Sequence, residues 1–181
     1  MNTWIALLRG INVGGRNKLP MKALVGLLEN LGCEDVKTYI QSGNAVFRSN
    51  RKNHASLAAD ISSEIGKQYG FEPRVLLVRL EDLESVIAAN PFPEAEEDPK
   101  FLHVGFMASR PEKPKLDKLK EFSAETERFK IVDSAFYLHA PEGIGRSRLA
   151  QNAERLIGVA MTDRNWRTVL KLREMAESIC E

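Results

Sequence analysis

Cysteine and histidine are scarce in this chain. Its 181 residues include two cysteines, Cys33 and Cys180, and three histidines. No Cys-x-x-Cys or His-x-x-x-His pair occurs, which excludes the common zinc and dithiol motifs, so we expect neither a metal nor a cofactor. Two cysteines without such spacing are typical of free thiols in a reducing compartment, and the sequence therefore predicts a cytoplasmic protein.

Long hydrophobic runs and an excess of one charge are also missing. No apolar run approaches the roughly 20 residues that span a membrane, and the N-terminus lacks the basic-then-apolar order of a signal peptide. Lys and Arg number 26 against 25 Asp and Glu, which gives a net charge of +1. Dedicated duplex-binding modules are usually far more basic. We therefore expect no membrane partner, and nucleic acid is a disfavoured partner unless a local basic patch supplies the contacts.

Apolar residues in regular patterns are abundant. They make up 43% of the chain, which is enough for a hydrophobic core. In the first half, glycine-bounded apolar runs alternate with segments whose leucines and isoleucines recur at helical spacing. The expected elements are a strand at 3–10, a helix at 21–31, a hairpin of strands at 36–41 and 45–49, a helix at 54–69, a strand at 74–80 and a helix at 81–90.

The second half repeats this order. The expected elements are a strand at 101–108, a helix at 113–122, strands at 128–133 and 135–140, a helix at 147–158, a short strand at 159–162 and a closing helix at 164–179. Residues 91–100, with three prolines and four carboxylates, have the composition of a linker. The sequence therefore predicts an α+β fold of two tandem ferredoxin-like (βαββαβ) units, each followed by an extra helix, at residues 1–90 and 101–181.

The segment "LRGINVGGRNKLP", residues 8–20, is the most polar connection between two apolar elements. Gly10 and Gly15 have the spacing of the outer glycines of a P-loop, but Arg16 and Asn17 stand where that loop needs lysine and then serine or threonine. A nucleoside-triphosphate site is therefore disfavoured. The segment nevertheless holds more donors than a turn needs, which indicates either a ligand site or structural bracing. These donors are Arg9, Asn12, Arg16, Asn17 and Lys18.

The expected hairpin carries a second polar cluster in "QSGN", residues 41–44. In an RNA-recognition domain the following strand would carry stacking aromatic rings, yet two of those positions hold Asn44 and Val46, and Phe47 is one place out of register. RNA recognition is therefore disfavoured. Gln41, Ser42 and Asn44 are typical of turn chemistry and could also bind a ligand.

A third cluster, "MTDRNW", precedes the closing helix. We expect Thr162 or Asp163 to cap this helix and Arg164 and Asn165 to lie in its first turn. A cation at that end opposes the helix dipole, so Arg164 needs an anionic partner from the protein or from a ligand.

Several of these segments together resemble the DUF1697 family of uncharacterised bacterial proteins. The resemblance rests on "ALLRGINVGGRN", "TYIQSGNAVF", "ANPF", "YLHAPEGIGRS" and "TDRNWRTVLKL", in this order over nearly the whole chain. It implies an α+β protein with ferredoxin-like subdomains, and it implies no activity, substrate, cofactor or catalytic residue. Arg148 departs from the lysine expected at its position, which preserves charge but changes the contact geometry.

Two functional hypotheses follow, neither of which identifies a catalytic residue or an oligomeric state. The first is a site for a small anionic polar ligand, with undefined enzymatic activity. Its candidate residues are Arg9, Asn12, Arg16, Asn17, Gln41, Ser42, Asn44, Arg164 and Asn165. The end of the first strand and the hairpin tip are expected at opposite ends of neighbouring strands, so these loops would meet only between halves.

The alternative is a binding module for nucleic acid or protein. It would use the sheet surface and a modest basic rim formed by Arg16, Lys18, Arg48, Arg51 and Lys52. A third possibility is that the polar loops only dock one half onto the other.

Overall fold

The chain folds as two compact units of the α+β class, which confirms the α+β part of the predicted fold. The computed structural model describes residues 1–180 and contains there two four-stranded antiparallel sheets and six α-helices. The first unit comprises Met1–Glu84 with residues 171–180, and the second comprises Ser85–Leu170. This division places residues 91–100, whose composition is that of a linker, inside the second unit. Two short 3-10 helices, Pro93–Glu97 and Pro99–Phe101, form there.

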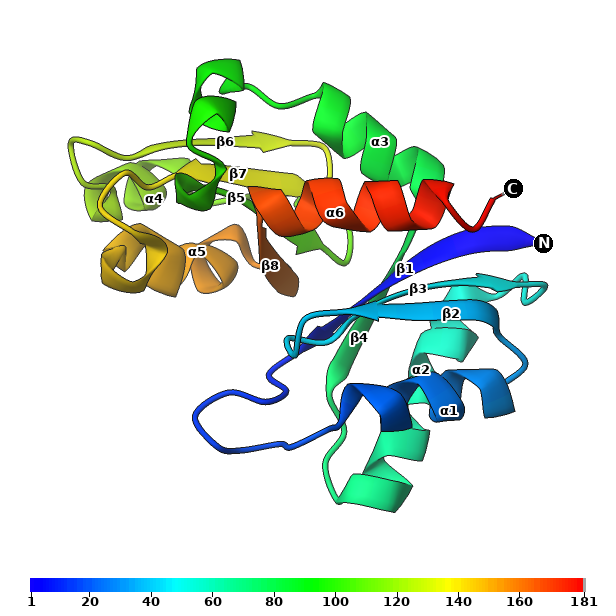
Figure 1. The fold of residues 1–181 in the computed structure, drawn as a ribbon. Helices are drawn as coiled ribbons and strands as arrows, with labels where there is room; N and C mark the ends of the chain where they lie inside the picture. The colour runs from blue at the N-terminus through cyan, green and yellow to red at the C-terminus, as the bar shows by residue number, and fades with distance from the viewer. Residues whose placement is uncertain (181) are drawn as a thin grey trace. The chain divides into compact units, whose positions relative to one another are not determined.

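The first unit contains one sheet with the strand order β2-β3-β1-β4 (Figure 1). Its elements are β1 (Asn2–Arg9), α1 (Met21–Asn30), β2 (Glu34–Tyr39), β3 (Asn44–Ser49), α2 (His54–Tyr69) and β4 (Arg74–Arg79), and α3 (Leu80–Ala88) follows along the chain. All three strand pairs are antiparallel, and the end of β1 lies beside the start of β3, with Leu7 opposite Asn44.

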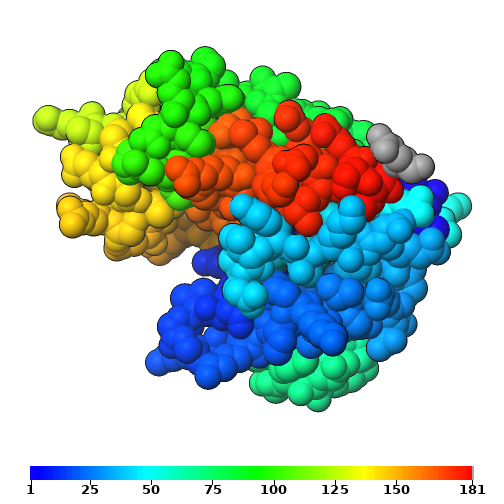
Figure 2. Space-filling view, in the orientation of Figure 1, coloured from blue at the N-terminus to red at the C-terminus, as the bar shows by residue number. Residues whose placement is uncertain are grey.

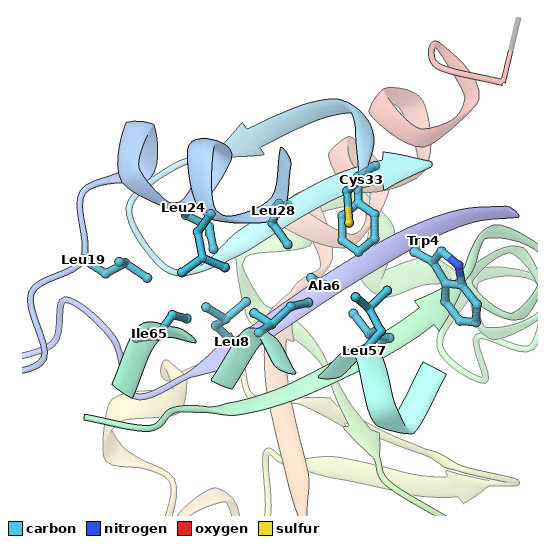
Figure 3. Close-up of a cluster of buried hydrophobic side chains, with 14 of the residues drawn as sticks. Trp4, Ala6, Leu8, Leu19, Leu24, Leu28, Cys33, Leu57 and Ile65 are labelled. Atoms are coloured by element: carbon cyan, nitrogen blue, oxygen red, sulfur yellow. The ribbon is translucent and has the colours of Figure 1, made fainter. Parts of the chain in front are cut away.

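One face of this sheet packs against α1 and α2. Trp4, Ala6 and Leu8 alternate along β1 and belong to a buried cluster with side chains from both helices (Figure 3). Leu24 of α1 and Leu57 of α2 are fully buried in it. Each large aliphatic side chain removed from water in this way contributes about 1.5–3 kcal/mol, so this cluster is the main source of stability for the unit.

The opposite face of the same sheet contacts the C-terminal segment of the unit. The Nζ of Lys37 donates to the Oγ of Ser178 at 3.1 Å, and the Oγ1 of Thr3 lies 3.1 Å from the Sγ of Cys180. Ile179, between these two residues, is buried. Residues 178–180 therefore belong with the first sheet, although they lie far from it along the chain.

The second unit contains a sheet with the corresponding order β6-β7-β5-β8. Its elements are β5 (Leu102–Met107), α4 (Leu116–Phe122), β6 (Arg128–Val132), β7 (Ala135–His139), α5 (Arg148–Ile157) and β8 (Met161–Asn165), and α6 (Trp166–Glu177) follows. A buried cluster with Met107, Phe136 and Leu138 of the sheet includes Leu119 of α4 and Leu149 of α5.

Two helix starts were predicted correctly from their capping residues. The Oδ1 of Asn53 accepts from the N–H of Ser56, and the Oγ of Ser147 accepts from the N–H of Ala150, both at 3.0 Å. Side-chain oxygens at these positions satisfy amide groups that have no partner inside the helix. Gly70, predicted to end α2, adopts φ 77° as its C-cap.

The predicted start of the closing helix is wrong. Thr162, Arg164 and Asn165 lie in β8, which pairs along β5 from Met107 to His103. The backbone hydrogen bonds of this edge strand extend the sheet by three residues beyond the expected strand. Asn165 itself caps α6, because its Oδ1 accepts from the N–H of Arg167 at 3.0 Å.

Candidate functional site

The loop after β1 folds into a miniature hairpin. The N–H of Arg16 donates to the carbonyl of Val13 at 3.0 Å, and the two residues form an isolated β-bridge. Gly14 and Gly15 occupy the turn with φ 58° and 74°. Consecutive positive φ values suit a two-residue turn of this kind, and glycine adopts them without steric penalty. The double glycine therefore builds a tight turn that places Val13 and Arg16 at its two sides.

Asn12 anchors this hairpin. Its Nδ2 donates to the carbonyl of Leu19 at 2.9 Å and to the carbonyl of Gln41 at 2.8 Å, while its Oδ1 accepts from the N–H of Leu19 at 2.8 Å. Asn17 acts similarly on the other side, because its Nδ2 donates to the carbonyl of Gly10 at 2.9 Å. The structure thus gives both side-chain amides partners inside the chain, where they hold the loop in shape.

The first loop and the hairpin tip lie side by side within the first unit. The expectation that they would be at opposite ends is wrong, because β1 runs antiparallel to β3, and its end therefore meets the beginning of β3. The N–H of Leu8 donates to the carbonyl of Gly43 at 2.8 Å, and the bond from Asn12 to Gln41 joins the same two segments.

The polar residues of the hairpin tip divide into exposed and buried groups. Gln41 and Ser42 are exposed, whereas Asn44 is fully buried at the first position of β3. The Nδ2 of Asn44 donates to the carbonyl of Tyr39 at 3.2 Å and to the Oγ of Ser42 at 3.0 Å. Asn44 therefore shapes the turn, and the side chains of Gln41 and Ser42 are the polar groups that this tip presents outward.

Cations of the first loop lie at the surface of the unit. Arg9, Arg16 and Lys18 are exposed, and the segment that carries them is at the surface in Figure 2 (dark blue, lower left). Arg9 ends β1, with its Cα opposite that of Arg74. Within residues 1–180, Arg16 and Lys18 have neither an ion pair nor a side-chain hydrogen bond. Val13, at the tip of the same loop, is 66% exposed.

Arg164 and Asn165 are described with the second unit. The Nη1 of Arg164 donates to the carbonyl of Asp163 at 2.8 Å, and burial lowers the pKa of Arg164 to about 10 against the opposing influence of Asp163. The Nδ2 of Asn165 donates to the carbonyl of Lys100 at 2.8 Å. Asn165 therefore has a structural role on both sides of its amide, since its oxygen also caps α6.

The basic rim of the alternative hypothesis is partly neutralised inside the first unit. The Nε of Arg48 lies 2.5 Å from the Oδ2 of Asp35, and the Nη2 of Arg51 lies 2.6 Å from the Oδ2 of Asp60. A guanidinium already paired with a carboxylate offers less net charge to a phosphate backbone. This pairing leaves Arg16, Lys18 and Lys52 as the stronger cations of that rim.

A pair between a buried histidine and an exposed carboxylate was not anticipated from sequence. The Nδ1 of His103 lies 3.2 Å from the Oδ2 of Asp163, across neighbouring strands β5 and β8. The Nε2 of His103 is buried without a hydrogen-bond partner among the described residues. A histidine in a strand and an aspartate 60 residues later give no local signal, because only the strand pairing brings them together. Over residues 1–180, no group of three or more potential metal ligands is present.

The two thiols differ in their environment, and this difference predicts their reactivity. Cys33 is buried, and burial raises the pKa of its thiol to about 11, although Arg51 and Ser49 act in the opposite direction. Cys180 is exposed. Because the thiolate is the nucleophile, we expect Ellman's reagent at about pH 8 to modify Cys180 promptly and Cys33 only after unfolding. Prompt modification of both thiols in the folded protein would contradict this assignment.

The raised pKa of Cys33 also gives the stability a pH dependence. The folded state keeps the proton above the reference pKa of 9.0, where the unfolded state releases it. The stabilisation of the folded state by the raised pKa of Cys33 is therefore complete below pH 9.0, and it is lost as the pH rises towards about 11.

Among the helices of residues 1–180, none is long and apolar enough to cross a membrane.

Comparisons with known proteins agree with this architecture. The family model "Protein of unknown function (DUF1697)" matches residues 1–137. Among solved structures, the conserved bacterial protein SP0830 from Streptococcus pneumoniae is similar with a TM-score of 0.73 and 26% sequence identity, over 97% of this chain and 98% of that chain. No curated protein sequence matches the chain. The similarity supports the fold over nearly the full length of both chains and names no ligand or reaction.

Proposed function

The chain belongs to the DUF1697 family, and from that premise we propose that it binds a small, polar anion at the loop after β1. The observation that carries this proposal is the contrast within one loop. Asn12 and Asn17 are committed to bonds that hold its shape, whereas Arg16 and Lys18 are exposed and without a partner among residues 1–180. Because some of its polar residues already hold the loop in one conformation, little conformational entropy is lost when a ligand binds to the residues that it displays. This preorganisation favours binding.

The chemistry of the displayed groups defines the class of ligand. The guanidinium of Arg16 can donate two parallel hydrogen bonds to a carboxylate or phosphate, and the ammonium of Lys18 adds a mobile positive charge. Arg9 at the base of the loop and the side-chain amide of Gln41 at the neighbouring hairpin tip are further candidate donors. The matching ligand is a small phosphate- or carboxylate-bearing molecule with neutral hydrogen-bonding groups.

The nucleic-acid alternative has weaker support. A phosphate backbone is bound by a row of cations, and two of the five rim residues, Arg48 and Arg51, are paired with carboxylates. The remaining cations fit a compact anion better than an extended polymer.

A titration with inorganic phosphate tests the proposed site. At low ionic strength we expect the backbone amide resonances of Gly14 and Gly15 to shift with a dissociation constant of about 1 mM, a typical strength for one small anion. The double variant Arg16→Ala/Lys18→Ala should weaken this binding by about tenfold or more, because it removes both charges. Its unfolding midpoint should stay within about 2 °C of the original, since both side chains are exposed.

Lys52→Ala, an exposed cation outside the loop, is the matched control and should leave the phosphate titration unchanged. Binding that survives the double variant would refute the proposed site. A large loss of thermal stability in the double variant would instead identify these cations as structural.

We also propose that each unit has the ferredoxin-like topology. The matching strand orders β2-β3-β1-β4 and β6-β7-β5-β8, with antiparallel pairing throughout, support this description and an origin by internal duplication.

A further inference from the structure

The edge strand β6 of the second unit is regular, as are the edge strands β4 and β8. Figure 1 shows β6 beside β7. Its five residues pair with β7 in continuous register, from Arg128 opposite His139 to Val132 opposite Ala135. The corresponding edge strand of the first unit, β2, is interrupted by a register shift between Glu34 and Lys37. Such irregularities prevent an edge from pairing with another chain, and β6 has none. Its outward N–H and C=O groups are therefore arranged to accept a further strand.

Two hollows adjoin this edge and share one residue. A cavity of about 510 Å³ runs from Phe92 to Phe129, and a second cavity of about 360 Å³ runs from Phe129 to Asp133. Together they are lined by four of the five residues of β6, Arg128 to Ile131, a length of roughly 13 Å in an extended strand. A depression of this shape fits an extended chain.

Apolar side chains line the depression at the spacing of a strand. Phe129 and Ile131 alternate along β6, are half-buried, and contact the core of the second unit. Leu116, at the start of α4, forms part of the opposite wall and is 46% exposed. Alternate side chains of an added strand would therefore meet apolar surface.

Cations surround this apolar surface. Lys120 and Lys130 line the two hollows and have no ion-pair partner among the described residues. Arg110 pairs with Asp133 at 3.5 Å, but both side chains are more than three-quarters exposed, at 79% and 78%, so the pair is weak. Glu127 also lines the first hollow, where its Oε2 accepts from the N–H of Ala124. The two lysines outnumber this carboxylate, so the charge that remains is positive and complements an acidic segment.

We propose that the β6 edge binds an extended acidic peptide segment of a partner protein by strand addition, with apolar side chains at alternate positions. A second copy of this chain fits less well. In an antiparallel pair of β6 edges centred on the strand, Lys130 would lie directly opposite its own equivalent, and like charges opposite one another are destabilising. This proposal concerns the second unit and is independent of the anion site in the first.

The test uses the full chain and a fluorescein-labelled peptide of alternating glutamate and valine. We expect saturable binding by fluorescence anisotropy, and binding weaker by about tenfold or more for a peptide with lysine in place of glutamate. A glutamate–valine peptide N-methylated at every residue should also lose binding, because neither of its edges can donate to β6. If the lysine or the N-methylated peptide binds as well as the first, the proposal is overturned.

Two pairs of variants locate the site. Leu116→Asp, which alters the apolar wall, and Lys130→Glu, which reverses a charge, should each weaken binding of the glutamate–valine peptide by about tenfold or more. The matched controls Ile40→Asp, which changes a residue 51% exposed in the first unit, and Lys52→Glu should bind normally. Equal losses in controls and test variants would overturn the proposal. A dimer of the original protein that Leu116→Asp dissociates would also overturn it, because the occupant would then be a second copy.

Discussion

Replacing Gly43 with alanine should destabilise the protein more than any other single change to the polar loops. A Cβ at this position would lie 2.7 Å from the Cβ of Leu8 and 2.8 Å from the Cδ1 of Ile11. Leu8 is buried and its Cβ moves only with the backbone of β1, so a shift of that strand would be needed to relieve the clash. The backbone of Gly43 also has φ 80°, which disfavours a side chain. Overpacking and the left-handed backbone together should cost roughly 3–5 kcal/mol.

Thermal unfolding measured by circular dichroism would detect this loss as a decrease of about 10 °C or more in Tm. Gly14→Ala is the matched control, because Gly14 also has a positive φ of 58° but has no atom within 4 Å of the added Cβ. This control isolates the backbone cost of about 1–2 kcal/mol. Similar Tm values for the two variants would show that the contact between Gly43 and the first strand is not as close as described.

Asn12→Ala should produce the second large effect. The substitution removes three hydrogen bonds, to the carbonyls of Leu19 and Gln41 and from the N–H of Leu19. It also places alanine at φ 53°, a left-handed conformation that asparagine tolerates better. At about 1 kcal/mol for each bond and a similar backbone cost, the free energy of unfolding should fall by roughly 3–4 kcal/mol. Denaturant titration would measure this loss as a lower midpoint with an unchanged m-value.

Two further variants separate these contributions. Asn12→Gly accepts the left-handed backbone and should recover about 1 kcal/mol relative to alanine. Asn17→Ala removes one hydrogen bond, to the carbonyl of Gly10, and places alanine at φ 50°. The free energy of unfolding should fall by only about 2 kcal/mol. If Asn12→Ala were neutral, the loop would not depend on this side chain, and the argument that it is braced before ligand binding would fail.

The stability and binding measurements together distinguish the two kinds of polar residue in the first loop. Asn12→Ala should weaken phosphate binding because the loop loses its shape, and it should also lower stability. Arg16→Ala/Lys18→Ala should weaken phosphate binding without a comparable loss of stability. The proposed ligand site and the structural brace share one short segment, and we expect their residues to respond differently to alanine substitution.

Periodic patterns in the sequence predicted nearly every element. Leucines at helical spacing identified α1, and the Gly-Asn turn identified the hairpin of β2 and β3. Asn53 and Ser147 marked two helix starts because a capping bond spans only three residues. The start of α6 was misplaced because the pairing of β8 with β5, a contact between distant segments, extends the strand to Asn165.

The role of each polar residue was beyond such reasoning. Asn12, Arg16 and Asn17 are equally plausible donors in the printed sequence, and the tertiary hydrogen bonds of the two asparagines distinguish them from the arginine. The His103–Asp163 pair likewise depends on strand register.

The sequence by itself determined the order and type of the elements, because helical and strand periodicity, caps and turns are local properties of a few neighbouring residues. Tertiary structure alone decided that the first loop meets the hairpin tip, which side chains are committed inside the chain, and that β6 forms an open edge. These features arise from strand pairing and packing between residues far apart along the chain, for which no local pattern exists.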